Sequence, residues 1–303
     1  MSDNKETMPH LMPWAKEIAL LPNCERIQRV RTDRWVGYTK ATQAVSKLEM
    51  LLSHPKRQRM PNLLLIGPTN NGKSMIIEKF RRTHLAEKSA HYQPEEMPIV
   101  IVQMPSDPKI PRFYSMLLYA MNVRLISRSR IADLETKVLQ ALERLKVKLL
   151  IIDETHNLLA GTAIAQREFL NLIRFLGNQL KIPIVCVGTK DAYYAVRSDD
   201  QLENRFEPFT LPLWQNDEEF ASFLTSITAT FPLRKPSALI TPDLMHFILD
   251  KSEGTIGEIM TLLTKATVLA IELGEEMINK KILAQIDYQS PTERKRIFER
   301  AFG

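Results

Sequence analysis

The residues with the clearest chemistry run from Gly67 to Ser74 and read G-P-T-N-N-G-K-S. They match the pattern G-x-x-x-x-G-K-[ST] between a strand-like apolar run and a helix-like run, which is the context that this pattern requires. The two glycines let the backbone turn tightly, so that several N–H groups point inward at phosphate oxygens, and the amino end of the following helix adds partial positive charge. The segment therefore predicts a site for the phosphates of a nucleotide.

Every position of this loop is expected to take part in nucleotide binding: Gly67, Pro68, Thr69, Asn70, Asn71, Gly72, Lys73 and Ser74. Lys73 is expected to reach the β- and γ-phosphates, and the Ser74 hydroxyl to ligate Mg²⁺. A chance match in a turn is disfavoured, because the chain has only 10 glycines and still completes the pattern in its proper context. ATP and Mg²⁺ are the expected cofactors.

A second apolar run, L-L-I-I-D, delivers Asp153 and Glu154 to its end. Ligands of open α/β sheets bind at the carboxyl ends of the strands. Asp153 is expected to hold Mg²⁺, directly or through water, and Glu154 to orient and deprotonate an attacking water. Two solvated acids at a strand end are the alternative, which the upstream phosphate loop disfavours. The pair predicts hydrolysis of the γ-phosphate rather than its transfer to a small acceptor.

Two further residues follow in chain order. Thr189 ends the run I-P-I-V-C-V-G-T, where its hydroxyl could bind the γ-phosphate or the water, or could simply end a strand. Arg205 precedes another strand-like run, on a segment that could face a neighbouring subunit. An arginine supplied to a second subunit would stabilise charge on the transferring phosphoryl group. The alternative is a surface arginine paired with Glu203 or Glu207, and the order of the motifs favours the intersubunit role.

Strand-like runs alternate with helical patterns, which predicts a parallel α/β sheet of five strands. The strands are expected at 63–66, 99–104, 149–153, 184–187 and 209–214. The helices are expected at 42–52, 73–84, 113–121, 131–145, 163–180, 218–230, 242–251, 257–273 and 280–286. The expected domains are a basic N-terminal arm (1–40), an α/β domain (41–213), a helical domain (214–286) and a basic tail (287–303) that is a short helix or a disordered peptide.

Charge is distributed unevenly along the chain, whose net charge is +6. Residues 105–130 carry five basic residues against Asp107 alone, whereas residues 211–286 carry six basic and ten acidic residues. This distribution favours a polyanionic partner for one face, with a solvated basic face as the alternative. The expected DNA contacts, mainly to phosphates, are Lys109, Arg112, Arg128 and Arg130.

Composition excludes several classes of protein. With 44% hydrophobic and 25% charged residues, disorder throughout the chain is not expected. No apolar run is long enough to span a membrane, and the N-terminus lacks the pattern of a signal peptide. The only cysteines, Cys24 and Cys186, form neither a metal spacing nor a disulfide framework, so a reducing cytoplasm is expected.

These motifs together resemble an AAA+ ATPase: a phosphate loop, an Asp-Glu strand, a threonine after the fourth strand, Asn-Arg-Phe before the fifth and a C-terminal helical lid domain. Three segments also resemble the TniB family, the ATP-binding transposition proteins of bacterial transposons related to TnsC. They read R-W-V-G-Y-T-K-A, L-E-M-L-L-S-H-P-K-R-Q-R-M-P-N-L-L-L-I-G-P-T-N-N-G-K-S and E-G-T-I-G-E-I-M-T-L-L. The likeness runs from about residue 15 to residue 286.

The resemblance implies a bacterial, cytoplasmic regulator of transposition. Such a protein assembles with ATP on double-stranded DNA as a ring or helical filament. It recruits or activates a transposase, communicates with a TniQ-type targeting protein and disassembles on hydrolysis. Thr189 would be its sensor and Arg205 its arginine finger. Many AAA+ proteins also place an arginine at the start of a lid helix, but residues 254–258 read G-T-I-G-E here, so a slow, regulatory ATPase is expected.

Other functions stay open at this point. Another AAA+ ATPase of the replication-initiator or loader type would more often show a helix-turn-helix domain or a lid arginine. A phosphate-loop kinase would need arginines in its lid, whereas this lid is acidic. A nucleotide-switched scaffold without hydrolysis is disfavoured by Glu154. Trp35, Val36 and Tyr38 are expected either to cover the adenine or to pack a helix onto the sheet.

Overall fold

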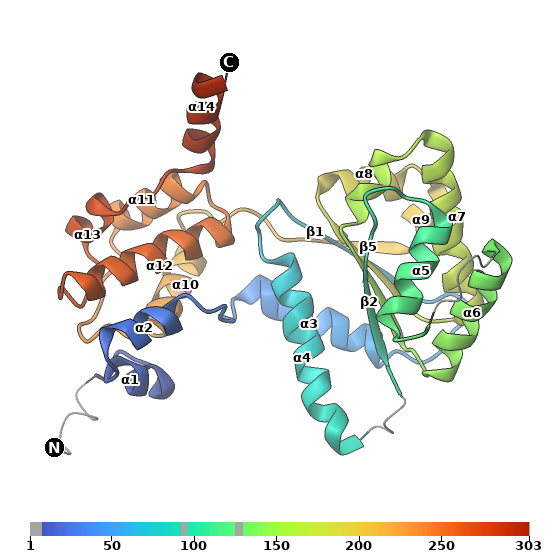
Figure 1. The fold of residues 1–303 in the computed structure, drawn as a ribbon, viewed down its shortest axis with the longest axis horizontal. Helices are drawn as coiled ribbons and strands as arrows, with labels where there is room; N and C mark the ends of the chain where they lie inside the picture. Colours follow the sequence, from blue (N-terminus) through green and yellow to red (C-terminus); the bar gives the residue numbers. More distant parts are fainter. Residues whose placement is uncertain (1–7, 92–95, 125–129, 303) are drawn as a thin grey trace. The chain divides into compact units, whose positions relative to one another are not determined.

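The chain folds into two compact units, each with its own hydrophobic core (Figure 1). The computed structural model describes residues 8–91, 96–124 and 130–302. The sheet unit is Lys40–Pro212, and the helical unit combines the described residues of Met1–Thr39 and Leu213–Gly303.

Five parallel strands form the sheet, in the order β2-β3-β4-β1-β5. They are β1 (Asn62–Ile66), β2 (Ile99–Gln103), β3 (Leu149–Asp153), β4 (Ile184–Gly188) and β5 (Phe206–Thr210). The pairing of β1 with β4 ends at Ile66 opposite Gly188, so the carboxyl ends of these two strands are level. Every residue of β1 and β4 is buried, as is typical of parallel strands that helices cover on both faces.

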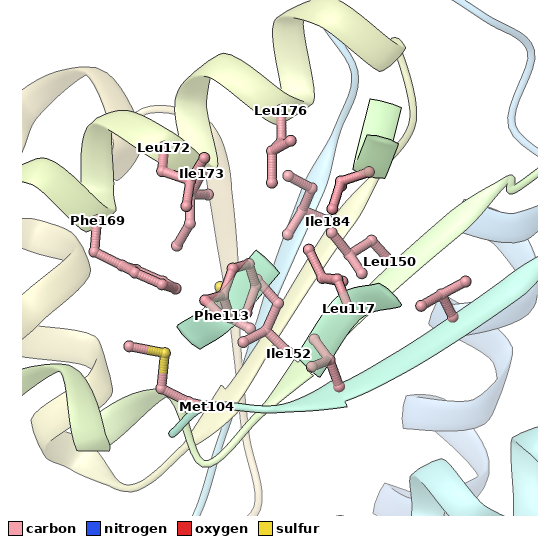
Figure 2. Close-up of a cluster of buried hydrophobic side chains, with 14 of the residues drawn as sticks. Met104, Phe113, Leu117, Leu150, Ile152, Phe169, Leu172, Ile173, Leu176 and Ile184 are labelled. Atoms are coloured by element: carbon pink, nitrogen blue, oxygen red, sulfur yellow. The ribbon is translucent and has the colours of Figure 1, made fainter. Parts of the chain in front are cut away.

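Helices pack on both sides of this sheet. Figure 1 shows α3 and α4 to one side of the strands and α5, α6 and α7 to the other. The helices and the 3-10 helix η1 of the sheet unit are α3 (Thr39–Leu52), α4 (Lys73–His91), α5 (Ile110–Ala120), α6 (Ile131–Arg144), η1 (Thr155–Ala160), α7 (Ala163–Leu180), α8 (Lys190–Arg197) and α9 (Asp200–Glu203). Figure 2 shows apolar side chains of α5 and α7 meeting those of β3 and β4. Within this core, the rings of Phe113 and Phe169 lie 4.8 Å apart at 78°, a favourable edge-to-face arrangement.

The predicted five-stranded parallel sheet followed by a helical region is confirmed. The fifth strand, however, begins three residues earlier and ends four residues earlier than the range 209–214 that the apolar pattern predicts. Pro208 interrupts that pattern, yet it lies inside β5 opposite Leu64. The strand tolerates it because β5 is an edge strand that pairs only with β1, so one side of its backbone needs no donor.

The helical unit includes the N-terminal segment, which differs from the expected separate arm at 1–40. Its helices are α1 (Pro13–Ala19), α2 (Asn23–Val30), α10 (Glu218–Thr228), α11 (Pro242–Ser252), α12 (Ile256–Glu272), α13 (Lys280–Gln285) and α14 (Pro291–Phe302). Val30 is 1% exposed in the same core as Phe220 and Ile259. The prolines and basic residues of this segment predicted a separate arm, but they do not show that α2 packs its apolar side chains into this core.

The tail beyond residue 287 is helical in part. Helix α14 has no buried residue, and Lys251 joins it to α11 through an ion pair of 2.9 Å with Glu293. Of the described residues, no helix alone is both long and apolar enough to cross a membrane, and α11 with α12 meets that test only as a pair bent by 114°.

A buried ion pair ties α2 to the loop that follows α12. The Arg26 side chain is fully buried and donates to both carboxylate oxygens of Glu276, at 2.8 and 2.5 Å, and to the carbonyl of Pro232 at 2.7 Å. Burial alone would raise the pKa of Glu276, but the hydrogen bonds from Arg26 and from the backbone N–H of Arg234 outweigh it and lower that pKa. The pair fixes the N-terminal segment to the C-terminal helices.

We expect Glu276→Gln to lower the free energy of unfolding of the helical unit by about 3 kcal/mol, because it leaves Arg26 as an uncompensated buried charge. Urea denaturation at pH 7 measures this. Glu275→Gln is the matched control, since Glu275 pairs with Lys281 at the surface; equal losses for the two variants would contradict the role of the pair. A carboxylate with a lowered folded-state pKa contributes stability above its unfolded pKa of about 4.3 and loses it as the pH falls further, so the difference between wild type and Glu276→Gln should shrink in acid.

Candidate functional site

The phosphate loop joins β1 to α4 at the carboxyl edge of the sheet. Its base is held by a hydrogen bond of 3.1 Å from the N–H of Gly67 to the carbonyl of Gly188, at the end of β4. Asn70 and Gly72 have φ angles of 58° and 82°. Glycine adopts this left-handed region without a steric penalty, and asparagine is among the side chains that tolerate it best. Residues 68–70 are exposed, so the tip of the loop is open to solvent.

The side chain of Lys73 closes the loop from inside. Lys73 is 7% exposed, and its ammonium donates to the carbonyls of Gly67 and Pro68, at 2.8 and 2.6 Å. Burial lowers the pKa of Lys73, and the nearby carboxylates of Glu154 and Asp153 act in the opposite direction. A phosphate beside this ammonium would favour its charged form in the same way.

Asn71 fixes the loop to the segment that follows β5. Its buried amide nitrogen donates to the carbonyls of Leu211 and Pro212, each at 3.0 Å. The loop is therefore held in place by a side chain as well as by its glycines. The sequence motif treats this position as variable, so motif matching alone gives no sign of the contact.

Two oxygen ligands suited to Mg²⁺ lie next to the loop. The Ser74 hydroxyl, in the first turn of α4, donates to Oδ2 of Asp153 at 3.1 Å, and Asp153 ends β3. The other carboxylate oxygen of Asp153 accepts the backbone N–H of Glu154 at 2.8 Å, which fixes its orientation. In nucleotide sites Mg²⁺ takes one or two protein oxygens and completes its shell with phosphates and waters, so this pair fits the ion.

Glu154 stands at a sharp turn between β3 and η1. Its backbone is in the left-handed region, with φ 56° and ψ 35°. Strain of this kind costs roughly 1–3 kcal/mol and is found mostly at functional sites. Oε2 of Glu154 lies 3.1 Å from Nε2 of His156, and both side chains are about one third exposed. Sequence reasoning missed His156 as a partner of the glutamate; the spacing D-E-x-H was the available signal.

Thr189 follows β4, which lies between β3 and β1 in the sheet. It is the N-cap of α8, and its hydroxyl accepts the N–H of Asp191 at 3.4 Å. The structure thus brings Thr189, the two acids and the phosphate loop to the carboxyl ends of three adjacent strands. Gly188 allows this close start of α8, since a Cβ there would lie 2.7 Å from the Cβ of Ala192.

Arg205 lies at the opposite edge of the sheet. Its carbonyl accepts the N–H of Asn62, the first residue of β1, at 3.2 Å. The phosphate loop begins at the other end of that strand, and the strand spans about 13 Å at about 3.3 Å per residue. Arg205 donates from Nη1 to Asn178 at 2.7 Å. The expected alternative pairing with Glu203 or Glu207 is not formed.

Those two glutamates have other partners. Glu203 binds Arg197 and Glu207 binds Lys47, each at 2.5 Å. Arg205 is therefore the one predicted catalytic residue that the fold keeps away from the chain's own phosphate loop.

Three of the four predicted DNA contacts lie at helix starts. Lys109 and Arg130 are the N-caps of α5 and α6, and Arg112 lies in the first turn of α5. A hydrogen bond of 2.7 Å from Tyr114 to Glu135 joins the first halves of these helices. Lys109, Arg112 and Arg130 are exposed, and Lys109 pairs with Asp107 at 2.9 Å. The fourth, Arg128, lies outside the described residues.

Val36 and Tyr38, just before α3, pack against the core of the helical unit rather than on the sheet. The ring of Tyr38 lies 5.0 Å from that of Trp214 and 6.2 Å from that of Phe223. Burial raises the pKa of Tyr38 to about 12, and the charge of Glu219 adds to that rise.

Comparisons with known proteins agree with this fold. A family model, "Bacterial TniB protein", matches residues 26–216. Comparison with curated proteins gives no match. The Orc1 protein of Aeropyrum pernix, solved in complex with DNA, is similar with a TM-score of 0.63 and 16% identity, over 89% of this chain and 69% of that one.

Two further solved structures are similar. The Orc2 protein of Aeropyrum pernix, in ADPNP–ADP complexes, has a TM-score of 0.61 and 16% identity, over 84% of this chain and 70% of that one. Cdc6p of Pyrobaculum aerophilum has a TM-score of 0.58 and 15% identity, over 83% and 68%. At such identities the likeness shows the fold, which is that of AAA+ ATPases with a C-terminal helical region.

We expect Asn71→Ala to weaken ATP binding about tenfold, since it leaves two carbonyls without their donor and releases the loop from the segment after β5. Calorimetric titration with ATP measures the affinity. Lys79→Ala, an exposed change on α4 away from the loop, should bind ATP like the wild type. An unchanged affinity for Asn71→Ala would show that the glycines alone fix the loop.

Proposed function

The chain belongs to the bacterial TniB family, and on this basis we propose that it is an ATP-hydrolysing regulator of transposition that assembles on DNA. The observation that carries the proposal is the division of one catalytic set between two sheet edges. The phosphate loop, Asp153 and Glu154 meet at the carboxyl edge, and Arg205 lies at the amino edge. A complete set then needs two copies of the chain.

The residues at the carboxyl edge have distinct tasks in hydrolysis. Lys73 and the loop N–H groups bind the phosphates of ATP. Ser74 and Asp153 would hold Mg²⁺, which when bound neutralises charge on the β- and γ-phosphate oxygens. Glu154 accepts a proton from the attacking water, and the contact with His156 fixes its carboxylate. Thr189 orients the γ-phosphate or the water through its hydroxyl.

Arg205 completes the site of a neighbouring copy. Its guanidinium would stabilise the charge that develops on the transferring phosphoryl group, a contribution of about 10³-fold or more in related phosphoryl-transfer sites. The two surfaces that meet are different, so the contact is head-to-tail and generates a ring or a helical filament. ATP then joins neighbouring copies, and its hydrolysis separates them.

The assembly would bind double-stranded DNA mainly through phosphates, with Lys109, Arg112, Arg128 and Arg130 as the proposed contacts. It would work in the bacterial cytoplasm and link a TniQ-type targeting protein to a transposase. Slow hydrolysis would keep the assembly in place until the transposase arrives. The start of α12 supports slow turnover, because residues 254–258 read G-T-I-G-E and include no arginine that could sense the γ-phosphate.

A role in replication initiation or loading is the second candidate, favoured by the likeness to the Orc1 and Cdc6p folds. That likeness rests on the fold, whereas the TniB match rests on this chain's own sequence, so transposition is preferred. Rescue of transposition, but not of replication, in a host that lacks the protein would separate the two.

We expect Glu154→Gln to reduce ATP hydrolysis at least about a hundredfold while ATP still binds, since only the general base is lost. The variant should accumulate as ATP-bound oligomers on duplex DNA, which electron microscopy and sedimentation detect. Glu168→Gln, an exposed change on α7, should hydrolyse ATP and disassemble like the wild type. A Glu154→Gln protein that stays monomeric with ATP and DNA would contradict regulation by assembly.

We expect Arg205→Ala to lower hydrolysis about 10³-fold and Lys73→Ala to abolish it, yet a mixture of the two variants should regain activity. In the mixture, the intact phosphate loop of one variant meets the intact Arg205 of the other. Steady-state hydrolysis at a fixed total concentration measures this. Arg197→Ala, whose arginine pairs with Glu203 at the surface, is the control. A mixture no more active than its parts would contradict a shared site.

A further inference from the structure

A groove of about 490 Å³ opens at the amino edge of the sheet, beside Arg205. It is lined by the end of α3, the loop before β1 and the start of β5, all within the sheet unit. Asn62 and Arg205, which are joined by a backbone hydrogen bond, are both among its lining residues. The groove is therefore separated from the chain's own phosphate loop by the length of β1.

The lining of this groove is strongly basic. It includes Lys47, Arg57, Arg59 and Arg205, with Glu207 as its one acid. That acid is already engaged by Lys47 at 2.5 Å. The guanidinium groups of Arg57 and Arg59 are exposed and have no acidic partner in the described part of the chain. Two guanidinium forks thus remain free to bind an anion.

Arg205 is held among like charges. Burial lowers its pKa, the charges of Arg59 and Arg174 lower it further, and Asp199 partly offsets them. In the described residues, its buried Nε has no hydrogen-bond partner. A cation kept in this environment gains from any anion that enters the groove.

We infer that Arg57 and Arg59 join Arg205 in binding the phosphates of a nucleotide held by a second copy of this chain. The inference rests on the proposed function, since it gives the neighbour's nucleotide two further ligands. Guanidinium forks bind phosphate oxygens in pairs, so three of them match a triphosphate better than one. The opposite edge carries Asp153 and Glu154 and would hold the negatively charged phosphates, so the two surfaces proposed to meet have opposite charge.

The position of these arginines favours a nucleotide over a DNA backbone. Arg57 and Arg59 line the same groove as Arg205, the residue proposed to act on the neighbour's γ-phosphate. The proposed DNA contacts, by contrast, lie at the exposed starts of α5 and α6. Contacts made in the groove are therefore expected to depend on whether the neighbouring copy holds ATP or ADP. Contacts of DNA with the starts of α5 and α6 are not expected to depend on the nucleotide.

The experiment compares assembly on a short duplex with a non-hydrolysable ATP analogue and with ADP. For each variant, the protein concentration for half-maximal assembly is measured by sedimentation, and the ADP value is divided by the ATP-analogue value. The double variant Arg57→Gln/Arg59→Gln should lower this ratio about tenfold or more, the effect of losing roughly one charge-assisted contact. Lys56→Gln, in the same exposed loop but outside the groove, should keep the ratio within about twofold of the wild type.

Each possible result of this experiment either supports or overturns the inference. An unchanged ratio in the double variant overturns the inference, whether assembly is normal or is weakened equally with both nucleotides, as a DNA contact predicts. Arg59→Lys, which keeps the charge and loses the fork, should fall between the wild type and the double variant, and it serves if the double variant is unstable. A wild-type ratio of one would instead remove the proposed function, and the inference with it.

Discussion

The length of β1 is the constraint on which the arrangement of this molecule's candidate site depends, because it separates Arg205 from the phosphate loop. All five strands run in one direction, so their carboxyl ends form one edge and their amino ends the other. The phosphate loop, Asp153 and Glu154 stand at the first edge, and Arg205 at the second. Because every residue of β1 and β4 is buried, these strands stay extended and keep the two edges one strand length apart. Under the proposed function, a chemical set that is divided in this way is complete only where two copies meet.

Buried contacts keep the nucleotide site ready while its tip stays open to solvent. The base of the loop is hydrogen-bonded to the end of β4, and Asn71 binds it to the segment after β5. Below it, the apolar faces of α5 and α7 fix β3 and β4, and with them the positions of the acids (Figure 2). The cost of ordering the loop is thus met during folding, which leaves binding energy for the ligand.

The sequence predicted the structure well where a short local pattern has one structural meaning, as with apolar runs and the phosphate-loop motif. Apolar runs predicted four strands nearly to the residue, and spacing predicted the segment between β1 and α4 and the two acids that the fold brings beside it. The roles of these residues stay predictions. It was uninformative where the outcome depended on distant partners. The N-terminal segment reads as a basic arm, because nothing local shows that Arg26 meets Glu276 or that Val30 enters the core of the helical unit. Sequence reasoning missed His156 and the arginines at 57 and 59 for the same reason, and it gave Asn71 a place in the loop without its contact to the segment after β5. The neighbours of these residues are set by the sheet and not by their own segments.

The most direct measurement is an electron microscopy reconstruction of the protein on duplex DNA with a non-hydrolysable ATP analogue. It should show the Arg205 guanidinium within hydrogen-bonding distance of the γ-phosphate held by the adjacent copy. An Arg205 that points away from every neighbour's nucleotide, or a monomer on the DNA, would contradict the account.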